Sequence, residues 1–131
     1  MFKDVAEFQK KFGHEYDGPP RELTYEEYSF KCDHLEEELV EFKEGWITSD
    51  LAAMLDALID LIYVALGIAY IQGFPFEEGW KRVHEANMKK VRASSAEESK
   101  RGSQLDIAKP EGWEPPQLQE ILDEARQNHI S

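Results

Sequence analysis

Two aspartates interrupt the most apolar stretch of this sequence. Asp56 and Asp60 are the charged residues within residues 51–72, and they lie four positions apart. In an α-helix, that spacing places both carboxylates on one face, about 6 Å apart along the axis. Burying two bare carboxylates side by side is costly unless a proton, a basic partner or a metal ion neutralises them. The stretch therefore predicts a buried helix with a charge-neutralising partner.

A second group of acids precedes this stretch. Glu38 and Glu41 are three residues apart, and Glu37 and Glu41 are four apart, so a helix places these carboxylates on a shared face. If this helix packs antiparallel on the apolar one, Glu38 and Glu41 come opposite Asp56 and Asp60. Four converging carboxylates repel one another, and hard divalent cations with oxygen ligands, usually Mg²⁺, remove that repulsion. We predict these four side chains as metal ligands.

Simpler explanations exist for each group taken alone. A run of glutamates is more often a solvated helix face than a site. Asp56 and Asp60 can form salt bridges to Lys or Arg, although buried acids without a function are rare. A di-iron helical bundle also uses buried carboxylates, but it needs Glu-x-x-His pairs. Lys or Arg stands three residues before every histidine here, so that motif is absent. The two acidic groups together favour the metal.

Hydrophobic spacing and helix-start signals outline the elements that position these acids. Thr24 and Glu27 form a capping box, Asp50 is an N-cap candidate, and Gly45 is expected to end the first of the two acidic helices. The predicted helices cover residues 2–12, 24–44, 50–72, 75–92 and about 118–125. The pattern indicates an all-α fold, an antiparallel bundle of four to five helices.

The length of the chain limits the number of domains and the size of the core. A chain of 131 residues is one domain by size, with its core at about 24–92 and a C-terminal arm at 93–131. Such a chain has little surface with which to cover an apolar helix of 22 residues on every side, so we expect the core to be completed in a homodimer or homotetramer.

The charge of the chain excludes several partners. A net charge of −12 argues against nucleic acid and against anionic membranes. The uncharged part of the apolar stretch, Leu61 to Ile71, is 11 residues long, whereas a membrane span needs about 20. Cys32 is alone, and the N-terminus has no signal-peptide core, so we expect a cytoplasmic protein that does not span a membrane.

Three motifs in order resemble a known family. Residues 37–41 (EELVE), residues 56–63 (DALIDLIY) and residues 83–90 (VHEANMKK) look like the MazG-like, all-α nucleoside triphosphate pyrophosphohydrolases, which share a superfamily with dimeric dUTPases and phosphoribosyl-ATP pyrophosphohydrolases. A Lys-Pro … Pro-Pro segment at residues 109–116 adds to the resemblance, which covers about residues 24–118. The family pattern needs an acid at position 57, where Ala57 stands.

The resemblance implies a reaction and roles. Water attacks a nucleoside triphosphate to give the monophosphate and pyrophosphate, with Mg²⁺ or, in its place, Mn²⁺. Asp56 is expected to act in place of the missing acid, and Glu37 to orient or deprotonate the water. The predicted substrate-binding residues are Asn87, Lys90, His84 and Tyr63. The alternative function is a non-catalytic helical dimerisation or regulatory module with structural acids.

Overall fold

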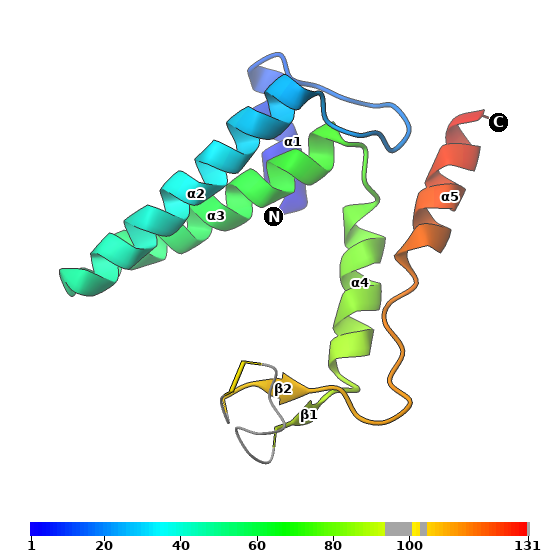
Figure 1. The fold of residues 1–131 in the computed structure, drawn as a ribbon. Coiled ribbons are helices and arrows are strands. Elements are labelled where there is room, and N and C mark those ends of the chain that lie inside the picture. Colours follow the sequence, from blue (N-terminus) through cyan, green and yellow to red (C-terminus); the bar gives the residue numbers. More distant parts are fainter. Residues whose placement is uncertain (94–100, 103–104, 131) are drawn as a thin grey trace. The chain divides into compact units, whose positions relative to one another are not determined.

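The computed structural model describes residues 1–93, 101–102 and 105–130, and it divides the chain into two compact units. The first unit is Met1–Phe76 with Glu124–Ser131, and the second is Glu77–Asp123. The helices are α1 (Phe2–Lys11), α2 (Tyr25–Ile47), α3 (Leu51–Ile71), α4 (Phe76–Asn87) and α5 (Leu118–Ile130), and the strands are β1 (Val91–Arg92) and β2 (Ile107–Ala108) (Figure 1). The predicted all-α fold is confirmed.

Helices α2 and α3 form an antiparallel hairpin, and their starts follow from their caps. The hydroxyl of Thr24 accepts from the backbone N–H of Glu27 at 3.1 Å, and the carboxylate of Glu27 accepts from the N–H of Thr24 at 2.9 Å. Asp50 accepts from the N–H of Ala53 at 3.0 Å. Both predicted caps are therefore confirmed, and the short link between Ile47 and Leu51 makes the two helices run side by side.

The prediction that Gly45 ends α2 is wrong, because the helix continues to Ile47. Gly45 is buried, and a Cβ there would lie 2.8 Å from Cγ of Met54 and 3.2 Å from the backbone nitrogen of Met54. The glycine serves the close approach of α2 to the start of α3. It does not provide the left-handed residue that often follows a helix end.

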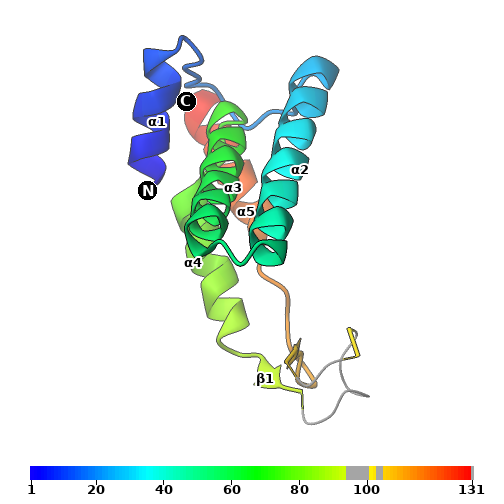
Figure 2. The same ribbon diagram turned by 90° about the vertical axis from the view of Figure 1, so that its left-hand side faces the viewer.

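Helix α3 lies between α1 and α2 (Figure 2). Helix α1 reaches it through two buried side chains, Val5 and Gln9. Both approach α3 at Gly67, where a Cβ would lie 2.9 Å from Nε2 of Gln9 and 3.8 Å from Cγ1 of Val5. The small residue in α3 thus allows α1 to pack closely.

The remaining surface of α3 is apolar and exposed in the single chain. Its exposed large side chains are Leu51, Leu55, Leu58, Ile59 and Ile62. The helix is also long and apolar enough to cross a membrane, with a mean hydropathy of 2.1 in its 18-residue window, of which 22% is buried in the chain. Core helices of soluble proteins meet the same criterion of length and composition. The expected all-round burial of α3 is therefore not reached within one chain.

The second unit contains most of α4, the two short strands and the start of α5. Helix α4 ends at Asn87, so its predicted extension to residue 92 is wrong: Val91 and Arg92 pair antiparallel with Ala108 and Ile107. The indole Nε1 of Trp113 donates to the carbonyl of Ala86 at 2.7 Å. The same carbonyl also accepts from the backbone N–H of Lys89 at 3.2 Å, so the indole is a second donor at the C-terminal end of α4.

Candidate metal centre

Three acids from α2 and α3 converge in the first unit. Glu38 and Glu41 come from α2 and Asp60 from α3, and one carboxylate oxygen of each lies within 4.8 Å of the others. Glu38 is buried, Asp60 is half-buried and Glu41 is exposed. The group is therefore open to solvent on one side, as a site that must admit a ligand requires.

Glu38 is the buried member of this group. The residue is 8% exposed, and its Oε2 atom has no hydrogen-bond partner among the described residues. Burial, followed by the neighbouring carboxylates of Glu41, Asp60 and Glu37, raises the pKa of Glu38 from 4.5 to about 7. The imidazole Nε2 of His34, one turn earlier on α2, lies 3.6 Å from Oε1 of Glu38.

A divalent cation fits these residues. An unpartnered buried carboxylate oxygen usually signals a missing ligand, ion or water. The three carboxylates converge with no Lys or Arg paired to them among the described residues, and they offer the oxygen donors that Mg²⁺ or Mn²⁺ takes. The ion would be held by Glu38, Glu41 and Asp60.

Asp56 lies outside this group of three. Successive residues of a helix are 100° apart, so Asp60 lies between Asp56 and Ala57 around the axis of α3. Ala57 is on the buried side, with 1% of its surface exposed, and Asp56 is exposed. A longer acidic side chain at position 57 would point between the helices, whereas Asp56 faces solvent. Glu37 is also exposed, one residue before Glu38.

The predicted substrate-binding residues lie in both units. Tyr63 in α3 is half-buried and packs edge to face against Phe8 of α1, with ring centroids 5.4 Å apart. His84 and Asn87 are exposed on α4, in the second unit. Lys90 follows α4, and its Nζ lies 5.0 Å from the centroid of the Trp113 ring.

Sequence reasoning missed His34 and a cavity near the start of α2. His34 has a detectable signal, because it stands four residues before Glu38 and so shares its face. The cavity has no such signal, since its walls come from α1, the following loop, α2 and the end of α3.

An all-α hairpin that presents clustered carboxylates to a divalent ion is a scaffold suited to phosphoanhydride hydrolysis. The family model for phosphoribosyl-ATP pyrophosphohydrolase matches residues 5–87, a span that includes all three clustered acids. The chain belongs to this family, which confirms the resemblance to the wider MazG-like superfamily. Members are pyrophosphohydrolases that act on nucleotide-type substrates, typically with a divalent metal. No curated protein matches the chain.

Proposed function

We propose that this protein hydrolyses a nucleoside triphosphate to the monophosphate and pyrophosphate, with Mg²⁺ held by Glu38, Glu41 and Asp60. The observation that carries the proposal is the state of Glu38: a buried carboxylate with an unpartnered oxygen beside two further acids. An arrangement kept only for stability would pair such a group with a cation or replace it by an apolar residue.

The clustered acids and the substrate are both anionic, so the acids cannot bind the triphosphate without a cation. When bound, Mg²⁺ neutralises and polarises the phosphate oxygens. The protein fixes the position of the ligands, because Glu38 is buried between α2 and α3 and Asp60 is half-buried opposite it. Preorganised ligands avoid rearrangement during the reaction.

Glu37 is our candidate for the residue that orients or deprotonates the attacking water. It is exposed, so water reaches it, and its charge acts on the neighbouring Glu38. A carboxylate in this position can accept a proton from water that is held near the cluster. Asn87 and Lys90, three residues apart around the end of α4, are the proposed phosphate contacts.

We further propose a homodimer or homotetramer in which a second copy covers the exposed apolar face of α3. Leu55, Leu58, Ile59 and Ile62 are each about half exposed or more in the single chain. A contiguous apolar surface of this kind on a strongly acidic chain is typical of an interface between subunits.

To test the activity, the protein is incubated with each of a set of nucleoside triphosphates and deoxynucleoside triphosphates, and the products are identified by ³¹P NMR. With Mg²⁺, one of them should give monophosphate and pyrophosphate in equal amounts, and EDTA should stop the reaction. Release of orthophosphate would contradict the proposed bond cleavage. No turnover of any nucleotide, with or without Mg²⁺, would favour the alternative of a non-catalytic helical module.

A further inference from the structure

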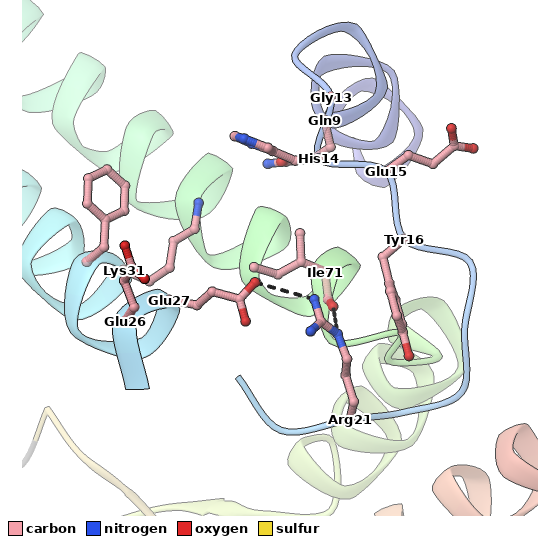
Figure 3. Close-up of a pocket in the computed structure, with 11 residues that line it drawn as sticks. Gln9, Gly13, His14, Glu15, Tyr16, Arg21, Glu26, Glu27, Lys31 and Ile71 are labelled. Atoms are coloured by element: carbon pink, nitrogen blue, oxygen red, sulfur yellow. Dashed lines mark hydrogen bonds and ion pairs between the residues drawn. The ribbon is translucent and has the colours of Figure 1, made fainter. Parts of the chain in front are cut away.

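A cavity of about 460 Å³ lies in the first unit, close to the start of α2 (Figure 3). Its walls come from the end of α1, the loop that follows, the first turns of α2 and the end of α3. The residues that matter below are Gln9, His14, Tyr16, Arg21, Glu27 and Lys31. The volume is in the range of small-molecule sites.

One wall of the cavity is held rigidly by Arg21. Its Nε donates to the carbonyl of Ile71 at 2.8 Å, and its terminal nitrogen lies 3.4 Å from Oε2 of Glu27. The guanidinium also stacks on Tyr16, 4.4 Å from the ring centroid. The backbone N–H of Arg21 donates to the carbonyl of Gln72 at 2.9 Å. Arg21 and Glu27 are thus occupied in shaping the site.

Two side chains in the lining remain free to donate hydrogen bonds. His14 and Lys31 make no hydrogen bond or ion pair through their side chains within the described part of the chain, and Figure 3 shows both pointing into the space between α1 and α2. Lysine offers only donors, and an imidazole offers at least one. Phe30, exposed and also in the lining, adds an aromatic ring next to Lys31.

An acceptor without a partner lies beside these donors. Gln9 is 4% exposed, and its Oε1 has no hydrogen-bond partner among the described residues. A buried acceptor left unpaired is energetically unfavourable, so such an atom usually marks a place where a ligand or a water binds. The last torsion of a glutamine is broad, which lets the amide turn toward a ligand that enters the cavity.

The cavity and the acid cluster lie on one face of α2. Glu27, Lys31, His34, Glu38 and Glu41 recur at steps of three and four, so they form a continuous stripe. Lys31 lines the cavity, and Glu38 belongs to the metal centre seven residues later, about 10 Å along the helix. An extended nucleotide spans such a distance between its base and its phosphates.

We propose that the cavity binds the base of the nucleotide, and that it selects bases with a lactam edge, a carbonyl next to a ring N–H. Lys31 and His14 donate to the carbonyl, and Gln9 accepts from the N–H. Guanine and uracil or thymine present this edge, whereas adenine and cytosine present an amino group next to an unprotonated ring nitrogen. The carbonyl of guanine is also a common partner of lysine. This inference rests on the proposed function but is tested separately from it.

The test uses nucleosides without phosphates, in EDTA, so that neither metal nor catalysis is needed. Guanosine and uridine should shift the amide NMR resonances of residues 13–16 and 30–31 of the full-length protein, with adenosine and cytidine binding at least tenfold more weakly. Lys31→Met should weaken guanosine binding at least fivefold. Lys43→Met, a matched change on an exposed part of α2 away from the cavity, should leave it unchanged.

Equal binding of all four nucleosides would overturn the selectivity, and unaltered binding by Lys31→Met would overturn the role of Lys31. If no nucleoside binds, the cavity is not a base-binding site. Nucleoside binding without turnover of any triphosphate would instead refute the proposed hydrolysis and leave the base site standing.

Discussion

Glu38 and Asp60 belong to different helices, yet a carboxylate oxygen of one lies within 4.8 Å of a carboxylate oxygen of the other. The antiparallel hairpin of α2 and α3 imposes this approach, and Glu41 joins it from the same side of α2. We expect such proximity to destabilise the metal-free protein and to favour the binding of a cation. Both consequences are measurable.

The raised pKa of Glu38 predicts how stability depends on pH in EDTA. A carboxyl whose pKa is about 7 when folded and about 4.5 when unfolded binds its proton more tightly in the folded state. Its contribution is therefore complete below about pH 4.5 and is lost as the pH rises through about 7. Relative to Glu38→Gln, the wild type should lose on the order of 3 kcal/mol of unfolding free energy over this window.

Urea unfolding at pH 4.5, 6 and 8 measures this difference. If the unfolding free energies of the wild type and Glu38→Gln change in parallel with pH, Glu38 does not hold its proton in the folded state. A saturating concentration of Mg²⁺ should flatten the difference, because a bound cation favours the ionised carboxylate.

Gly45 and Gly79 should respond in opposite ways to alanine. Both are inside helices, where alanine is intrinsically better by about 1 kcal/mol. A Cβ at Gly45 would lie 2.8 Å from Cγ and 3.2 Å from the backbone nitrogen of Met54, so overpacking of about 1–3 kcal/mol outweighs the gain. At Gly79 the nearest atom is Ile121 Cδ1 at 3.5 Å, an ordinary contact.

Denaturant midpoints of the two variants provide the measurement. Gly45→Ala should lower stability and Gly79→Ala should raise it. A Gly45→Ala variant more stable than the wild type would show that Met54, at the start of α3, does not pack tightly against Gly45 of α2.

Lys90 and Lys109 provide a matched pair for the phosphate assignment. Each places its Nζ 5.0 Å from the centroid of the Trp113 ring, so reversal of either charge removes a similar cation–π contact of about 0.5–1 kcal/mol. We expect Lys90→Glu to raise KM several-fold and Lys109→Glu to leave KM unchanged, with similar small losses in Tm. Equal KM values for the two variants would show that Lys90 contacts Trp113 but does not bind the substrate phosphates.

The apolar face of α3 predicts self-association. Ile62 is 51% exposed in the single chain, and an acid there should split the assembly into smaller species. Sedimentation velocity should show a dimer or tetramer for the wild type and a smaller species for Ile62→Glu. Met88→Glu, a similar change at an exposed position in the second unit, is the control. A wild-type monomer in detergent-free buffer at micromolar concentration would contradict the proposed assembly.

Local signals in the sequence predicted the caps and most helices. Thr24, Glu27 and Asp50 act within three residues of themselves, so their chemistry can be read from neighbours in the chain. The predicted end of α2 at Gly45 was wrong because the role of this glycine depends on Met54 in the next helix. The strand at Val91 was equally hidden, since its partner Ala108 comes later in the chain.

The acid cluster was predictable to the same degree. Helical spacing placed Glu38 and Glu41 on one face, and antiparallel packing of the two helices was expected to bring Asp56 and Asp60 opposite them; the structure brings Asp60 into the cluster. The same rule did not distinguish Asp56 from Ala57, because each is adjacent to Asp60 around the helix. Only packing shows which of the two positions is buried, and it is Ala57.

The proposed metal centre depends most on Asp60 as a ligand, and thermal unfolding of the wild type and Asp60→Asn, in EDTA and in Mg²⁺, tests this role directly. Asparagine keeps the shape and removes one charge from the cluster. In EDTA the variant should be as stable as the wild type or more stable, by about 1–2 kcal/mol, and it should lose most of the stabilisation by Mg²⁺. If Asp60 instead neutralises a buried cation, the variant should lose about 3–5 kcal/mol in EDTA. That loss, or an unchanged response to Mg²⁺, would contradict the metal centre.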